Sequence, residues 1–377
     1  MATLINLTDI APLAVGSRAV TQRHPLYEIW QAEWGKLANV REGTGGFIDG
    51  TYLIAHPREW LDHDSATPSK PTAKLKARRA LARYENIAAT ILEAKRAALF
   101  RETALRRVGS GGEQTTEIEQ WWTDVTGDST SMDEVMPTWW DLAATFGHVV
   151  LLFMPPATEA EVAADQDQPI VRVYPPLDVV DWITDAHGRL TAVKLVEALP
   201  AQRFEDNQSQ IAPPHQTRVV TENEIVLFDE HAKPISTVEH GLGRIPVTVL
   251  YGRRRAVVPE LGQSVLGDPR NYIDLYNLTS ELRELLRNQT FSFINLPLGT
   301  GADAMTVEQA QTMLGQQTGT MNVLFSGLAA SVLSGDAANV TAYQDDIKQL
   351  KRDIFRITGV QWESEDAGTD RREGNRF

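Results

Sequence analysis

The stretch GRIPVTVLYGRRRAVVPELGQSVLGDPRNYIDLYNLTSELRELLRNQTF, residues 243–291, decides the fold class because it joins a strand to a long helix. After the bend at Pro246, residues 247–251 form a short β-branched and aromatic run, which is typical of a strand. Further along, Leu275, Leu278, Leu282 and Leu285 alternate steps of three and four residues, as on the apolar stripe of a helix of about 25 residues. Both element types in one segment indicate a mixed α and β protein.

Both flanks of this stretch repeat the same two patterns. Residues 73–107 predict one long helix, and residues 169–240 contain short β-type runs separated by turn residues. Residues 341–358 predict a further helix, with Ile347, Leu350 and Ile354 on one side. We therefore expect the α+β class, with a small antiparallel sheet unit over 169–251 and two long helices near the C-terminal end.

The amino-acid composition and the charge exclude several classes of function. The 377 residues contain 42% hydrophobic and 23% charged residues, which is a globular balance. The absence of cysteine excludes disulfides, thiol catalysis and cysteine-bound zinc. The net charge is −14, yet residues 1–110 carry 16 Lys and Arg against 11 Asp and Glu, so the acidic excess lies further along the chain. A chain this acidic is not expected to coat nucleic acid with its whole surface.

Catalytic patterns are weak. Asp178, Asp181 and Asp185 could supply carboxylates to a metal, which keeps open a metal-dependent hydrolase, but a strand sends them to alternating faces. Ser264 has the wrong spacing for a nucleophile elbow and is interpreted as a helix N-cap. His148, beside an apolar run, is interpreted as a core histidine. We expect no enzyme, no cofactor and no metal site.

Four segments, taken in order, resemble the portal proteins of tailed bacteriophages. YENIAATILEAKRAALFR (residues 84–101) resembles the helix of the portal wing, and IVRVYPPLDVVDWITDAHGRLTAVKLVE (170–197) resembles the strands of that wing. The stretch 243–291 resembles the Ile-Pro strand that leads into the first stem helix. DDIKQLKRDIFRITGV (345–360) resembles the second stem helix before the tunnel loop. Together they extend over most of residues 75–377.

The resemblance implies a portal-like architecture for a ring-forming subunit, with a helical and β wing, a two-helix stem, a small α/β clip and a tunnel loop. Its implied parts are the wing at 1–258, the first stem helix at 259–292, the clip at 293–335, the second stem helix at 336–358 and the tunnel loop at 359–377. Portal proteins usually continue into a crown, which is expected to be absent from a chain that stops at Phe377.

The implied function is a conduit for DNA packaging by terminase and for DNA ejection. A ring of about twelve copies would occupy one capsid vertex of the virion after assembly in the host cytoplasm. The implied partners are further copies of the chain, the terminase large subunit, head-completion or adaptor proteins, and the major capsid and scaffolding proteins. Double-stranded DNA would pass through without sequence-specific binding, and no membrane is involved. A scaffold or adaptor that binds partner helices through residues 272–286 is the other open alternative.

The resemblance also implies two sets of site residues. The DNA channel and tunnel loop would be formed by Lys348, Lys351, Arg352, Arg356, Gln361, Trp362, Arg371 and Arg372. The stem interface between subunits would be formed by Tyr272, Leu275, Leu278, Leu282 and Leu285. The cations of the second helix could instead pair with Asp345, Asp346 and Asp353, on the same helix or in a neighbouring subunit.

Overall fold

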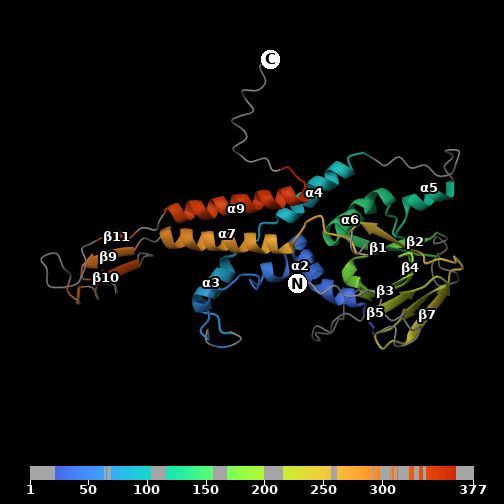
Figure 1. Ribbon diagram of the computed structural model, residues 1–377, viewed down its shortest axis with the longest axis horizontal. Helices are drawn as coiled ribbons and strands as arrows, with labels where there is room; N and C mark the ends of the chain where they lie inside the picture. Colours follow the sequence, from blue (N-terminus) through green and yellow to red (C-terminus); the bar gives the residue numbers. More distant parts are fainter. Residues whose placement is uncertain are drawn as a thin grey trace, which may run out of the picture. The chain divides into compact units, whose positions relative to one another are not determined.

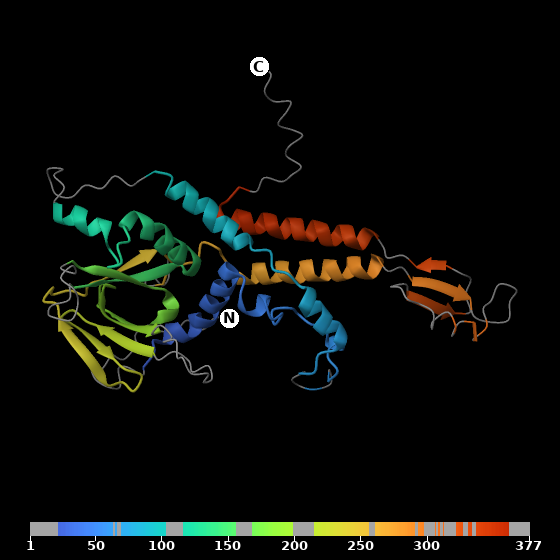
Figure 2. The same cartoon turned by 180° about the vertical axis from the view of Figure 1, so that it is seen from behind.

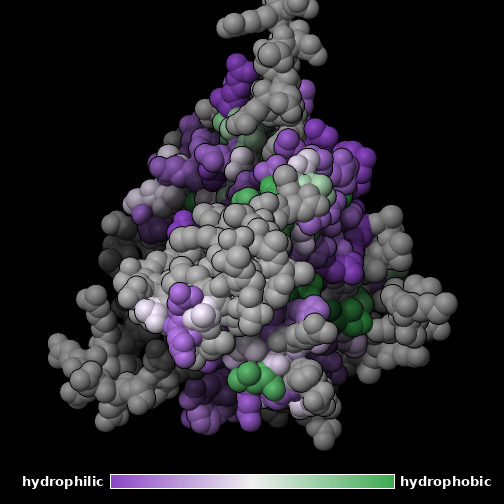
Figure 3. Space-filling model, turned by 90° about the vertical axis from the view of Figure 1, so that its left-hand side faces the viewer, coloured by the Kyte–Doolittle hydropathy of each residue, from purple (hydrophilic) through white to green (hydrophobic). Residues whose placement is uncertain are grey.

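The computed structural model describes a large part of the chain (Figure 1, Figure 2 and Figure 3, coloured parts). The described residues are 22–62, 65, 69–102, 116–155, 168–198, 215–255, 261–290, 293–297, 306, 308–309, 312, 322–326, 331–333 and 337–361. The chain divides into two compact units. Unit 1 comprises Met1–Arg41 and Ile87–Gly267, and unit 2 comprises Glu42–Asn86 and Asp268–Phe377.

Unit 1 contains a three-stranded antiparallel sheet beside several helices. The helices are α2 (Pro25–Glu42, which ends at the unit boundary), α4 (Ile87–Leu99), α5 (Thr116–Thr123) and α6 (Met132–Phe146). The sheet has the order β2-β1-β8, from β1 (His148–Met154), β2 (Ile170–Tyr174) and β8 (Val247–Tyr251). In the central strand, Leu151 lies opposite Val173 of β2 and Thr248 of β8. Strands nearly a hundred residues apart in sequence are thus neighbours in this sheet.

A second sheet of unit 1 is a five-stranded antiparallel meander in sequence order. Its strands are β3 (Val179–Thr184), β4 (Leu190–Ala198), β5 (His215–Val220), β6 (Glu224–Phe228) and β7 (Pro234–Glu239). A short 3-10 turn, η4 (Pro176–Asp178), leads into β3. The β-type runs of residues 169–240 therefore form two sheets, because Ile170–Tyr174 joins β1 and the later strands pair among themselves.

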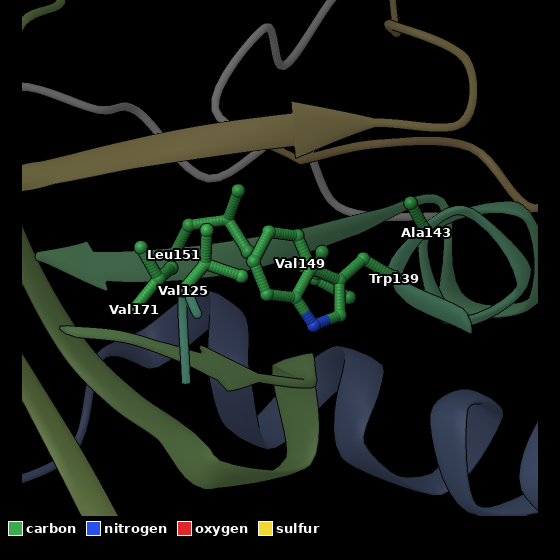
Figure 4. Packing of buried hydrophobic residues seen from close by; sticks show 6 residues of the cluster. All are labelled: Val125, Trp139, Ala143, Val149, Leu151 and Val171. Carbon is green, nitrogen blue, oxygen red and sulfur yellow. The ribbon is translucent and has the colours of Figure 1, made fainter. Parts of the chain in front are cut away.

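The core of unit 1 lies between α6 and the three-stranded sheet (Figure 4). Trp139 and Ala143 from α6 pack against Val149 and Leu151 from β1, with Val171 of β2 in the same cluster. Alternation places these two β1 residues on one face. The first five residues of β1 are nevertheless all buried, so both of its faces are covered, as its continuous apolar sequence predicts.

Unit 2 is built around two long helices that lie side by side, α7 (Pro269–Thr290) and α9 (Ala337–Thr358) (Figure 1 and Figure 2, orange and red). The shorter elements η2 (Gly45–Phe47), η3 (Pro57–Glu59) and α3 (Ala73–Leu81) precede them in sequence. Between the long helices the chain forms β9 (Phe293–Pro297), β10 (Asn322–Ser326) and β11 (Ser331–Leu333). In this small sheet β9 is central, parallel to β10 and antiparallel to β11.

Two local expectations are wrong. The single helix expected over 73–107 is two helices, α3 and α4, because Ala82 is extended and the chain then turns Tyr84 onto the ring of Phe47. Ser264 is no helix N-cap, since its Oγ accepts the N–H of Leu266 in a turn ahead of α7. Asp268 instead precedes α7, and its carboxylate accepts the N–H of Arg270 at 2.9 Å. Pro269 occupies the first helical position, which suits its fixed φ.

No helix among the described residues combines the length and apolar character that a bilayer span requires. The described residues seen in Figure 3 are mainly hydrophilic, with hydrophobic patches between them.

Candidate interface on the paired helices

Both α7 and α9, which lie side by side, contain buried apolar residues. Ile347, Ile354 and Phe355 of α9 are buried, and so are Tyr272, Leu275 and Tyr276 of α7. Tyr343 donates a hydrogen bond to the Glu281 carboxylate across the pair at 3.1 Å. Partial burial and the nearby carboxylate raise the pKa of the Tyr343 hydroxyl, which therefore stays a donor at neutral pH.

The first turns of α7 are anchored on the segment that follows α2. Tyr276 donates its hydroxyl proton to the Phe47 carbonyl at 3.1 Å, and the Phe47 ring stacks on Tyr84 with 3.9 Å between centroids. Asn277 accepts the N–H of Ile54 at 2.7 Å and donates to the Tyr52 carbonyl at 3.0 Å. These bonds satisfy backbone groups of the segment that follows η2, in addition to the turn hydrogen bonds within that segment.

The five α7 residues assigned to a subunit interface fall into two groups. Tyr272 and Leu275 have relative exposures of 0% and 2% within one chain, so they already contribute to the core of unit 2. Leu278, Leu282 and Leu285 are half-buried. Only the second group retains surface that another copy could cover.

The four α9 cations also divide. Lys351 turns toward Glu85 and reaches both carboxylate oxygens, at 2.7 and 2.8 Å. Arg356 forms an ion pair with Asp353 at 2.9 Å on the same helix, which is the arrangement that the alternative interpretation predicts. Lys348 and Arg352 are exposed and have no ion pair within the described residues. Lys348, Arg352 and Arg356 are four residues apart, so they form one basic stripe on the exposed side of α9.

The other residues expected to line the channel lie at or beyond the end of the described chain. Gln361 is exposed just after α9. Trp362, Arg371 and Arg372 lie outside the described residues.

A basic groove between α3 and α7 was not expected from the sequence. It has a volume of about 550 Å³, and Ala77 and Leu81 form part of its wall. Lys74 pairs with Glu284 at 3.0 Å, and Arg78 pairs with Glu59 at 3.1 Å. The other two cations are Arg283 and Arg287, both exposed on α7. Arg283 and Arg287 are four residues apart, on the polar side of the leucine stripe of α7. This spacing is the feature of the sequence that could have identified them.

The three aspartates of the hydrolase hypothesis have separate structural roles. Asp181 forms a buried pair with Lys194 at 3.4 Å, and the Lys194 amino group also donates to the Gln22 carbonyl. Asp185 accepts the N–H groups of His187 and Arg189, both at 2.8 Å, in the turn before β4, and these bonds lower its pKa. Burial raises the pKa of Asp178 to about 6. The described residues contain no group of three or more His, Asp or Glu side chains that could hold a metal ion.

His148 lies in the core of unit 1. Its Nδ1 accepts the N–H of Gly262 at 3.2 Å, and burial, with a smaller effect from Arg255, lowers its pKa to about 4. The ring is therefore neutral at physiological pH and can accept this bond.

Comparison with known proteins finds a distant similarity. No protein-family model matches the chain. The portal protein of Mycobacterium phage L5 is 24% identical over 262 residues, which is 67% of this chain and 50% of that protein. The chain thus spans about half the length of this curated relative. The similarity indicates a distant portal-like relationship.

Proposed function

We propose that the chain is the subunit of a phage portal ring. The observation that carries this proposal is the similarity to the mycobacteriophage portal protein, which extends over two thirds of the chain. The element order supports it, since a mixed α and β unit is followed by two paired helices with a small sheet between them in sequence.

In this proposal the parts have distinct roles. Residues 1–258 form the wing, α7 and α9 form the stem, residues 293–335 form the clip, and residues 359–377 form the tunnel loop. Terminase docks on the clip during packaging, and head-completion or adaptor proteins replace it there. The wing contacts the major capsid and scaffolding proteins at one vertex of the virion. The chain performs no catalysis, so the motor partner supplies the energy for packaging.

A conduit must hold DNA loosely, because strong cationic contact along the channel would stop sliding. The basic stripe on α9 suits this requirement. It offers Lys348, Arg352 and Arg356, while Lys351 is neutralised by Glu85. Arg356 is partly neutralised by Asp353. We assign this stripe to the DNA-facing side of the stem, where a few cations per copy contact phosphate transiently.

The native mass of the purified chain, with negative-stain images of the same sample, tests the proposal. We expect a closed ring of about a dozen copies around a central hole wide enough for duplex DNA. A monomer or dimer that persists as the concentration is raised would contradict the proposal and favour the adaptor alternative. ATP hydrolysis by the purified ring would contradict the non-enzymatic role.

A further inference from the structure

The two sheets of unit 1 end in four strands, and β8 and β7 are two of them. β8 lies at one end of the order β2-β1-β8, and β7 lies at one end of the order β3-β4-β5-β6-β7. A strand edge presents a row of backbone donors and acceptors, and these groups recognise an extended polypeptide.

Two backbone hydrogen bonds with β1 define the edge that β8 leaves open. Phe153 donates to the Pro246 carbonyl at 2.9 Å, and Gly252 donates to the Gly147 carbonyl at 2.8 Å. Antiparallel pairing alternates, so residues 246, 248, 250 and 252 bond to β1 and the residues between them face away. Within the described residues, the N–H and C=O groups of Val247 and Val249 have no hydrogen-bond partner.

The side chains of the same β8 residues line a cleft of about 530 Å³. Val249 lies opposite Val150, so both side chains are on one face of the sheet. Across the cleft lie Trp182 and Val193 of the other sheet, and Arg244 and Arg254 contribute positive charge. A strand added beside β8 would direct alternate side chains into this cleft.

β7 has the properties of such an added strand. All six of its residues are exposed, including Ile235 at 53% and Val238 at 39%. His240 donates to the Asn223 carbonyl at 3.1 Å, which places Ser236 and Val238 in the hydrogen-bonded pairs with β6. Thr237 and Glu239 therefore turn their backbone groups outward.

Edge strands are usually blocked by lysine, internal proline or a bulge. β8, with the sequence VTVLY, has no lysine or proline and pairs with β1 without a register shift. β7 has such features only at its N-terminal end, where Pro234 is its first residue and the register with β6 shifts at Ile235. The remaining residues of β7 pair with β6 in regular register.

We propose that β7 of one copy adds to the open edge of β8 in a second copy. In this pairing Thr237 enters the cleft beside Val249. Glu239 lies next to Arg244 when the strands are antiparallel and next to Arg254 when they are parallel. The donor and acceptor edges are different surfaces, so the contact is heterologous and propagates into a ring or a filament.

The proposal deepens the portal function and rests on it, because the ring is the assembly in which such contacts close. Because every copy contains β7, the proposal also identifies an occupant for the cleft of each copy. Its partner is therefore the chain itself, through the wing, in addition to any contact between the long helices.

Proline substitutions test the pairing without breaking the sheets. Val249→Pro and Thr237→Pro each remove an outward N–H and leave the pairing with β1 or β6 in place. Val173→Pro is the matched control, because Val173 faces away from β1 on the opposite edge of the same sheet. We expect both edge variants to lose the ring in native mass measurements while the control keeps it. Circular dichroism establishes that each variant is folded.

Cysteine pairing gives a positive test that does not depend on ring loss. The chain contains no cysteine, so Thr237→Cys and Val249→Cys introduce the only thiols. When the two purified variants are mixed and oxidised, we expect a disulfide-linked dimer on a non-reducing gel. Each variant alone, and Thr237→Cys mixed with Val173→Cys, should remain uncrosslinked because the contact joins two different edges.

The outcomes separate this inference from the portal proposal. A wild-type ring without the mixed crosslink, and with unchanged assembly in both edge proline variants, would overturn the strand pairing and leave the portal proposal intact. The mixed crosslink without a closed ring would support the pairing and contradict the portal proposal. Neither ring nor crosslink would overturn both.

Discussion

At the scale of single residues, Asp178 gives unit 1 an unusual pH dependence. Its carboxyl is half-buried at the end of η4, and burial raises its pKa from 3.8 to about 6, against a smaller opposing effect of His215. Since the folded pKa lies above the unfolded value, the stabilisation by Asp178 is complete below about pH 4 and is lost as the pH rises through 6.

Asp178→Asn should therefore stabilise the protein at pH 7 by up to about 2 kcal/mol, with a gain that vanishes near pH 4. Urea unfolding of wild type and variant across this pH range measures the difference. His24 and His148, whose pKa values are lowered by burial to about 4, titrate in both proteins and cancel in the comparison.

Asp185→Asn is the matched control. Backbone N–H groups lower the pKa of Asp185, so its stabilisation is present at neutral pH and lost as the pH falls. The control should therefore destabilise the protein at pH 7, with the opposite sign. Equal effects of the two substitutions would contradict the assignment.

These aspartates also show what the sequence could predict about the site. The alternation argument takes Asp178, Asp181 and Asp185 as residues of one strand, but only Asp181 lies in β3, while Asp178 ends η4 and Asp185 lies in the turn before β4. It cannot reveal that Lys194 neutralises Asp181, since that pairing needs the register of β3 with β4. The same holds for Lys351 and Glu85, which are far apart in sequence.

At the scale of elements, the turn from α6 to β1 depends on a close backbone crossing. Gly147 ends α6 with φ of 96°, and a Cβ there would lie 2.4 Å from the Gly262 carbonyl carbon. Gly188, in the turn before β4, has φ of 74° and no atom within 4 Å of such a Cβ. The positive φ favours glycine at both positions, but only at Gly147 would an added Cβ also collide with neighbouring backbone atoms.

Gly147→Ala should therefore destabilise the protein by about 2 kcal/mol more than Gly188→Ala, because overpacking adds to the cost of the left-handed backbone. Urea unfolding of both variants measures this difference. Equal losses would show that Gly262 can move away at little cost.

Helix periodicity predicted the long helices well and the shorter ones less well. Ile347, Leu350 and Ile354 indicate a helix over 341–358, and α9 begins only four residues earlier, at Ala337. The helical spacing of Tyr84, Ile87 and Ile91 predicts a helix that includes Tyr84, but α4 begins at Ile87, and the Tyr84 ring stacks on Phe47 from another part of the chain. Periodicity shows that a residue is buried and does not show which partner buries it.

At the scale of the whole molecule, the proposed ring should bind duplex DNA weakly and with a salt dependence set by the α9 stripe. The triple variant Lys348→Gln, Arg352→Gln, Arg356→Gln removes three exposed charges from each copy. Lys351→Gln removes a charge that Glu85 already neutralises and serves as the control. Each lost phosphate contact should reduce the slope of log affinity against log salt by about 0.9.

We therefore expect the triple variant to flatten the salt dependence of DNA binding by assembled rings, and the control to change it little. Fluorescence anisotropy of a labelled duplex, titrated with rings at several salt concentrations, gives the slope. An unchanged slope in the triple variant would place the phosphate contacts elsewhere, because helix geometry puts the three cations on one face and they would lose contact together. A steeper slope in the control than in wild type would contradict the neutral role of the Lys351–Glu85 pair.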